Sequence, residues 1–330
     1  MLRIRSSWCC LHHRPSGGND IPPCRISRGK AEVREMMPYP IFLLIALAIV
    51  LVPLLSASLW FIIFSLILPG FKDVTRGILR MDGEPLWKRD IALGASQLFF
   101  YMSVMLTVPA SAILELFFII PFILVMGAAN PVAQTFSVIS AGPIEEIMKW
   151  TSAATVYFLI YLSFGRTGKM PDRIRVGIAA GLFSGACFGL VESVGYLTSG
   201  TSDLINHGIS IRTLDPLIWR MVLGVSVHAM YTGIAAGGLG RFGWGNKFRT
   251  TLILLVSSIV LHSLNNGVQG LIVLIMGMDD LFGLILTDSV QMLLALAGFI
   301  LLSLLWRGIL LPSGRVSGGR KRASISISVG

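Results

Sequence analysis

Charged residues are scarce in this chain of 330 residues, where they make up 13% of the sequence. A soluble domain has about a quarter. Hydrophobic residues make up 54%, the mean hydropathy is +0.76, and no stretch between the apolar segments is long enough to bury a core of its own. These features exclude a soluble globular protein. They predict an all-α membrane protein, because a helix of roughly 20 apolar residues crosses a bilayer.

Cysteine is also scarce. Of the four cysteines, three lie in the N-terminal tail and Cys187 lies in an apolar segment, so there is no paired framework for disulfides. The net charge of +10 would suit a nucleic-acid partner, but the basic residues lie in short loops and tails beside the apolar segments. We therefore interpret the charge as a sign of membrane topology and expect no nucleic acid as partner.

Long apolar segments predict a polytopic transmembrane helical bundle of about 7–8 spans. The second segment is interrupted by Pro109 and Pro121, so its number of crossings is open. The segments cover residues 40–68, 91–129, 143–163, 175–198, 215–239, 249–274 and 282–306.

Lysine and arginine orient these segments. They are frequent in the loops 71–90, 165–175 and 241–249 and in the tail from Arg307, whereas the loop 198–214 has one arginine. Basic loops face the cytoplasm. We therefore expect an integral protein of the cell (plasma) membrane with a cytoplasmic C-terminus.

The chain divides by composition into three parts. Residues 1–36 contain no apolar segment and are expected to be a disordered basic tail, or to precede a true start of translation at Met36 or Met37. Residues 37–310 are expected to form a single transmembrane domain. The stretch 311–330, rich in glycine, serine and basic residues, is expected to be a disordered cytoplasmic tail.

Charged residues inside the segment 143–163 need an explanation. The motif GPIEEIMKW places Glu145, Glu146 and Lys149 there, and each costs on the order of 2.5–3.5 kcal/mol to insert. On a helix Lys149 lies four residues from one acid and three from the other, so it can pair with either. A simpler interpretation is that the acids favour the first turn of a helix beginning near Pro143.

Three further segments carry polar groups at a similar predicted depth, from the middle to the outer end of the membrane span. They are Glu192 in FGLVE, His228 in VHAMYTG, and His262 with Asn266 in LHSLNNG, for which Asn265 is an alternative. Glycines at four-residue spacing before Glu192 predict close helix packing; they are Gly177, Gly181, Gly185 and Gly189. Glu115 stands alone in its segment, and we expect a structural or lipid-interface role for it.

The ordered set EExxK, FxxxE, His and HxxxN, within Pro143–Gly267, resembles the PrsW family of membrane-embedded proteases, which is related to the CAAX-prenyl protease (ABI) group. The resemblance implies an intramembrane endopeptidase that hydrolyses peptide bonds of a membrane-anchored protein substrate. The lipid bilayer is its second partner.

The residue types suit this chemistry, which needs a base for water, donors for the oxyanion and an acid for the leaving amine. We expect Glu145 to be the base and Glu146 to orient it, with their roles exchangeable. The other assignments are a water-positioning or acid role for His228, oxyanion donation by His262 and Asn266, histidine orientation or shared base catalysis by Glu192, and supporting charges on Lys149 and Arg220.

Two versions of the site remain open. The preferred one requires no cofactor. The other holds Zn²⁺ through Glu192, His228 and His262 with Glu145 as base, a three-ligand set typical of catalytic zinc, although HExxH is absent.

Two alternative functions also remain. A proton-coupled transporter would use intramembrane Glu and His, but the sequence has no inverted repeat. A non-catalytic membrane scaffold with a protease-like fold is the other.

Overall fold

The computed structural model describes residues 39–79, 102–127, 130–165, 172–207, 210, 214–215, 218–241, 248–277 and 281–310. The tails expected at 1–36 and 311–330 lie outside the described residues. The chain divides into a short unit, Met1–Phe42, of which only the first residues of one helix are described, and the unit Leu43–Gly330, which contains the packing discussed below.

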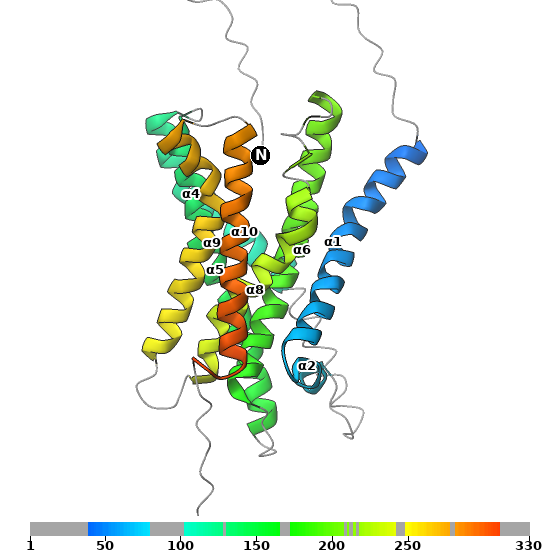
Figure 1. The fold of residues 1–330 in the computed structure, drawn as a ribbon, viewed down its shortest axis with the longest axis vertical. Coiled ribbons are helices and arrows are strands. Elements are labelled where there is room, and N and C mark those ends of the chain that lie inside the picture. The colour runs from blue at the N-terminus through cyan, green and yellow to red at the C-terminus, as the bar shows by residue number, and fades with distance from the viewer. Residues whose placement is uncertain are drawn as a thin grey trace, which may run out of the picture. The chain divides into compact units, whose positions relative to one another are not determined.

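All regular structure in the described residues is helical, which confirms the predicted all-α fold (Figure 1). Each of the seven predicted apolar segments contains a helix. The elements are α1 (Tyr39–Ile67), α2 (Phe71–Leu79), η1 (Met102–Thr107), α4 (Val108–Met126), α5 (Pro131–Gly165), α6 (Arg173–His207), η2 (Arg220–Gly224), α8 (Val225–Gly237), η3 (Gly238–Arg241), α9 (Phe248–Met276) and α10 (Leu281–Trp306).

Six helices in the described part of the chain are long and apolar enough to cross a membrane: α1, α4, α6, α8 with its flanking turns, α9 and α10. The helix α5 is not among them and carries the charged motif. Its 35 residues would extend about 50 Å, which is also long enough to cross. With α5 the helices account for the seven predicted segments.

The helix α8 forms the centre of the bundle. All 13 of its residues are buried, and it packs against α6, α9, α10 and α5. The most intimate contact is with α6, through the four glycines noted in the sequence. A β-carbon at Gly177 would lie 2.6 Å from the carbonyl oxygen of Ala236, and one at Gly189 would lie 3.0 Å from Cδ2 of His228. The predicted close packing is therefore confirmed.

A second close approach joins α5 to α9. A β-carbon at Gly142 would lie 2.8 Å from the backbone nitrogen of Ser263, and Gly267 and Gly270 on α9 meet Ile139 and Thr135 on α5 in the same way. Gly142 lies three residues before Glu145, and Ser263 directly follows His262. The contact therefore fixes the distance between the EExxK motif and His262.

The π-helical turn η2 leads into α8 and is held by α1. The indole Nε1 of Trp60 donates a hydrogen bond to the Val222 carbonyl oxygen at 2.8 Å, and the Ser56 hydroxyl lies 3.5 Å from the same oxygen. Such turns leave carbonyls without their usual helical partner and occur often at functional sites. Here α1 satisfies the carbonyl, two turns before His228.

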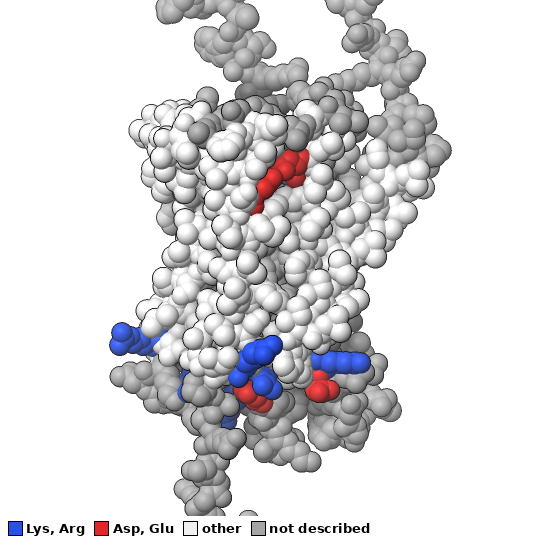
Figure 2. Space-filling model, in the orientation of Figure 1, with Lys and Arg blue, Asp and Glu red and all other residues white. Residues whose placement is uncertain are grey.

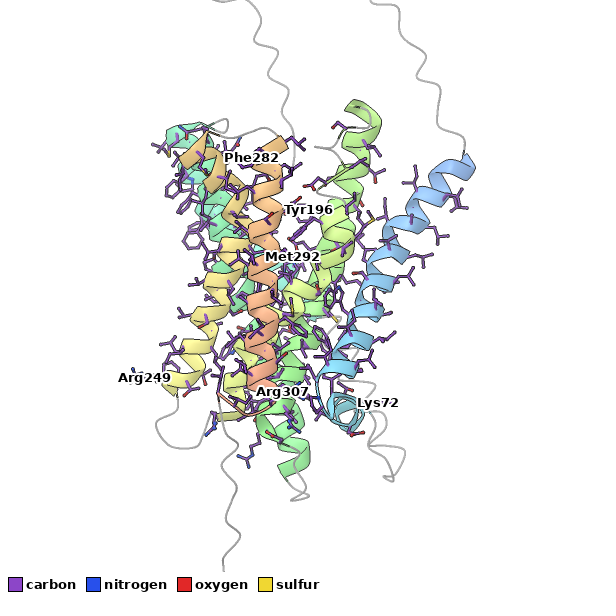
Figure 3. All side chains as sticks on the ribbon, viewed as in Figure 1. Lys72, Tyr196, Arg249, Phe282, Met292 and Arg307 are labelled. Atoms are coloured by element: carbon purple, nitrogen blue, oxygen red, sulfur yellow. The ribbon has the colours of Figure 1, made fainter. Side chains whose placement is uncertain are left out.

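Lysine and arginine gather at one end of the described helices (Figure 2). Lys72 follows α1, Arg249 opens α9 and Arg307 follows α10 (Figure 3). Phe282, at the start of α10, lies toward the opposite end. The alternation of helix ends agrees with the predicted topology, and the assignment of the basic end to the cytoplasm remains a prediction.

Candidate active site

Five of the six predicted catalytic residues converge from four helices. Glu145 and Glu146 come from α5, Glu192 from α6, His228 from α8 and His262 from α9. Lys149 joins them from α5, so the sequence-predicted charge pair forms. All but Glu192 are buried, and Glu192 has 16% of its side chain exposed.

The Lys149 ammonium lies at the centre of this cluster. Its Nζ is 2.6 Å from Glu146 Oε1, 3.4 Å from Glu145 Oε2, 2.9 Å from Nδ1 of His228 and 3.3 Å from Nδ1 of His262. The side chain is fully buried, so it is a fixed counter-charge. With neutral imidazoles, three carboxylates and one ammonium leave the cluster a formal charge of −2.

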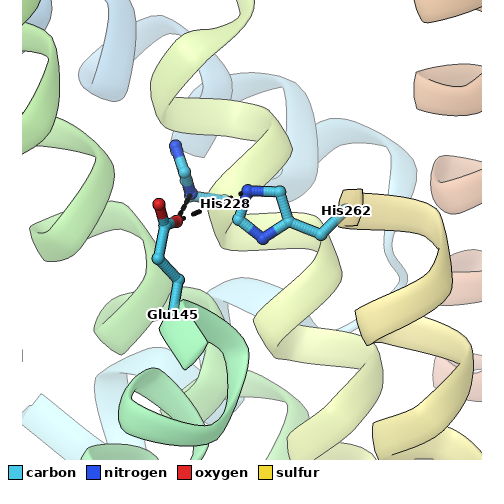
Figure 4. Close-up of side chains that lie close together, drawn as sticks. All are labelled: Glu145, His228 and His262. Atoms are coloured by element: carbon cyan, nitrogen blue, oxygen red, sulfur yellow. Dashed lines mark ion pairs between the residues drawn. The ribbon is translucent and has the colours of Figure 1, made fainter. Parts of the chain in front are cut away.

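Each histidine is held on one side by a carboxylate. His262 Nδ1 is 2.8 Å from Glu146 Oε1, and His228 Nε2 is 2.5 Å from Glu192 Oε2. The remaining nitrogens both face Glu145 Oε2, at 3.5 Å for His262 Nε2 and 3.8 Å for His228 Nδ1 (Figure 4). The two rings are nearly perpendicular, with centroids 4.9 Å apart. Glu145 therefore stands between two histidine nitrogens whose rings are oriented by other acids.

Glu145, His228 and His262 offer ligand atoms that lie within 4.8 Å of one another. This group differs from the zinc set expected from the sequence, which had Glu192 in place of Glu145 and stays a prediction. Glu192 instead contacts the opposite nitrogen of His228, so it stands behind the ring. His262 Nε2 is buried and accepts no hydrogen bond, and its near polar neighbour is Glu145 Oε2 at 3.5 Å. Two imidazoles, one carboxylate and a net negative charge fit a divalent transition metal.

Hydroxyl groups that the sequence reasoning missed surround Glu146 and Lys149. Thr232 Oγ1 and Ser258 Oγ lie 3.2 and 2.9 Å from Glu146 Oε2, and Ser184 donates to the Lys149 carbonyl oxygen at 2.9 Å. Thr232 follows His228 by four residues and Ser258 precedes His262 by four. That spacing places each hydroxyl on the face of its helix that carries the histidine, and it was the available signal.

Within the part of the chain that is described, the structure does not join the remaining predicted residues to this cluster. Asn266 is half-buried, and within the described residues no hydrogen bond or ion pair joins it to the other five. Asn265 is buried, its side-chain oxygen has no hydrogen-bond partner, and its backbone oxygen accepts from Gln291 of α10 at 2.8 Å. Arg220 belongs to η2, and its side chain lies outside the described residues.

A family model described as PrsW family intramembrane metalloprotease matches residues 93–302, nearly two thirds of the chain. The chain belongs to the PrsW family. Neither curated proteins nor solved structures gave a match. Membership, together with the membrane-spanning helices, makes this chain an intramembrane protease.

The PrsW match includes α4, which carries Glu115; its expected structural or lipid-interface role stays a prediction. Glu115 is half-buried between Leu114 and Leu116, which are exposed, and it interacts electrostatically with Glu192 and Lys149. It is therefore not isolated. Thr107, the last residue of η1, and Ser111 of α4 are buried at the same four-residue spacing, so η1 and α4 together turn polar groups toward the bundle.

Proposed function

We propose that this PrsW-family protease hydrolyses peptide bonds of membrane-anchored proteins at the cluster formed by Glu145, His228 and His262. One observation carries the proposal. One oxygen of Glu145 faces a nitrogen of each histidine, while the other nitrogen of each ring contacts a separate carboxylate. Such an arrangement suits a reactive centre supported by fixed partners.

Depth supports a site in the outer half of the bilayer. The helix α9 begins at the basic end with Phe248, and His262 lies 14 residues further along, a rise of about 21 Å. The hydrocarbon core is about 30 Å thick. With the basic end in the cytoplasm, the cluster therefore lies nearer the outer face of the plasma membrane.

Glu145 is the residue that we assign to water activation. Its contacts with Lys149 and both histidines are 3.4–3.8 Å long, looser than those of Glu146. In hydrolysis the water oxygen bonds to the carbonyl carbon, the carboxylate accepts the water's proton, and the C–N bond breaks as the amine receives a proton. Glu146 and Glu192 hold the histidines, and Lys149 compensates their charge.

The site residues also fit a divalent metal ion. His228 Nδ1, His262 Nε2 and Glu145 would hold it, and a bound Zn²⁺ supplies a Lewis acid for the carbonyl and for water. Three observations favour this version over the cofactor-free site preferred from the sequence. They are the family's description as metalloproteases, the lack of a hydrogen bond at His262 Nε2 and the net charge of −2.

A cleavage assay tests the function. The purified protein in liposomes is mixed with a tagged single-span substrate. Glu145→Gln and His262→Ala are compared with Ser257→Ala, which changes a half-buried serine bonded within its own helix. Both site variants are expected to lose about 10²–10⁴-fold in rate, and Ser257→Ala none. Cleavage at the parent rate by both site variants would show that the chemistry is misassigned. The absence of cleavage by the parent would favour a non-catalytic scaffold.

Metal removal separates the two versions of the site. Activity is expected to disappear after exhaustive chelation and to return with Zn²⁺. Full activity after chelation would restore the cofactor-free version. The geometry allows Glu145 to be either the base or a metal ligand, and zinc binding by Glu145→Gln distinguishes these two roles. Retained zinc binding assigns Glu145 as the base, and lost zinc binding assigns it as a ligand.

A further inference from the structure

Both carboxylate oxygens of Glu146 are bonded within the cluster. Its Oε1 contacts Lys149 Nζ at 2.6 Å and His262 Nδ1 at 2.8 Å, and its Oε2 contacts Ser258 Oγ at 2.9 Å and Thr232 Oγ1 at 3.2 Å. The carboxylate, the lysine, both hydroxyl residues and His262 are all fully buried. Four donors from three helices thus surround one carboxylate, and it cannot rotate without breaking several contacts.

The hydroxyls of Ser258 and Thr232 differ in their hydrogen-bond acceptors. Ser258 Oγ also lies 2.7 Å from the carbonyl oxygen of Tyr231, on α8. A serine hydroxyl carries one proton, so it cannot donate to both acceptors at once. Thr232 supplies a second hydroxyl to the same carboxylate oxygen. Glu146 therefore keeps a hydroxyl donor on Oε2 whichever acceptor Ser258 serves.

The orientation of Glu146 determines which nitrogen His262 presents to the site. Two groups meet Nδ1, and Glu146 Oε1 at 2.8 Å lies closer than Lys149 Nζ at 3.3 Å. An ionised carboxylate only accepts hydrogen bonds, so the shorter contact makes Nδ1 the protonated nitrogen of the neutral ring. The lone pair is then on Nε2, which faces Glu145 and has no hydrogen-bond partner. Carboxylates behind a ligating histidine fix its tautomer and ring orientation in this way.

We propose that Thr232 and Ser258 are positioning residues that hold Glu146 so that His262 presents the lone pair of Nε2 toward Glu145. The proposal rests on the proposed function, in which Nε2 faces the reacting centre. Neither residue touches that centre. Both act through Glu146, from α8 and α9, one helical turn from each histidine.

The test removes the hydroxyls while keeping side-chain volume, with Thr232→Val, Ser258→Ala and the double variant. Ser258→Thr keeps a hydroxyl at this position. Ser257→Ala is the control at the neighbouring serine, and Thr287→Val is the control at a buried threonine whose hydroxyl bonds within α10. Measurements are kcat and KM, Zn²⁺ affinity by chelator competition, and the His262 tautomer by NMR of ¹⁵N-histidine-labelled protein.

The double variant is expected to lose about 10–100-fold in kcat and in Zn²⁺ affinity, with KM unchanged, and to show a mixed His262 tautomer. Ser258→Thr and both controls are expected to resemble the parent. If the double variant does not fold, the single variants decide, each with a loss of roughly three- to tenfold. Parent-like kcat, affinity and tautomer in the folded variants would overturn the proposal.

The tautomer measurement keeps this inference separate from the proposed function. A parent that neither cleaves nor binds Zn²⁺ contradicts the proposed function. In that case an Nδ1-protonated ring in the parent that becomes mixed without the hydroxyls still supports the positioning role. A tautomer that does not respond to their removal contradicts it.

Discussion

The helices α4 and α8 differ in a way that is opposite to the pattern of soluble proteins. The span Val108–Met126 in α4 has the higher mean hydropathy, and 6% of its most apolar 18-residue stretch is buried. The span Met221–Arg241, which includes α8, is less apolar, and 94% of the corresponding stretch is buried. In water the more apolar helix would form the core. In lipid the apolar side chains face the solvent, and polar groups are placed where protein satisfies them.

The buried helices α6 and α8 also pack together more closely than apolar side chains would allow. The interface of α6 with α8 uses glycine against backbone, so the two main chains touch at successive turns. Without a hydrophobic force between helices in lipid, such close contact is a main source of association. It also carries His228 toward Glu192, so the same packing that stabilises the bundle sets the geometry of the site.

The largest effect is expected from filling that interface. Gly185→Leu places side-chain atoms against the backbone carbonyl of His228, where even a β-carbon has no room. We expect a loss of about 3 kcal/mol or more in the free energy of unfolding, and no proteolysis, because the helices must separate and move His228. Unfolding in detergent and the cleavage assay measure both.

Gly195→Leu is the matched control on the same helix, because a β-carbon there meets nothing within 4 Å. It is expected to fold and cleave like the parent. If the two variants behave alike, the α6–α8 contact does not determine the position of His228.

A second difference lies between two neighbours on α9. Asn266 shares a helix face with His262, whereas the backbone of Asn265 is bonded to α10. We expect Asn266→Ala to reduce kcat by about 10²–10³-fold, as does the loss of an oxyanion donor, with little change in stability. Asn265→Ala is expected to change stability more than kcat. The reverse result would make Asn265 the donor.

The fold and most of the site could be predicted because membrane insertion penalises charge. Apolar segments define the spans, and Glu145, Glu146 and Lys149 stand out against them. The hydroxyls do not stand out. Serine and threonine occur throughout the spans with bonds to their own helix, as Ser257 has to Ile253. Before the helices are packed, only the four-residue spacing from His262 distinguishes Ser258 from its neighbour.

The zinc set shows a second limit of the sequence. Glu145 and Glu192 are equally plausible ligands by residue type and depth. What separates them is which nitrogen of His228 each one meets, Nδ1 for Glu145 and Nε2 for Glu192. That choice depends on ring orientation, which is determined by tertiary packing against Phe188 and His262.

Glu115 is an exception in the comparison of α4 with α8, because it is an acidic residue on the lipid-facing helix. Glu115→Gln removes a charge that repels Glu192. We expect stability to rise by on the order of 1 kcal/mol, because an amide costs less to bury than a carboxylate, and kcat to change less than tenfold. Unfolding in detergent and the cleavage assay measure these. A loss of kcat above 100-fold would instead make α4 part of the reaction site.

The smallest effect is expected on the outer face of α4 itself. Leu124 is 80% exposed and Leu116 is 57% exposed, so in the membrane both would contact lipid rather than protein. In Leu124→Ala and Leu116→Ala, lipid acyl chains fill the space that the leucine side chain leaves, so no cavity forms within the protein. The free energy of unfolding should therefore change by less than about 0.5 kcal/mol, with unchanged kcat. A loss of 2 kcal/mol or more would mean that this face packs against protein, and α4 would then belong with α8 rather than opposite it.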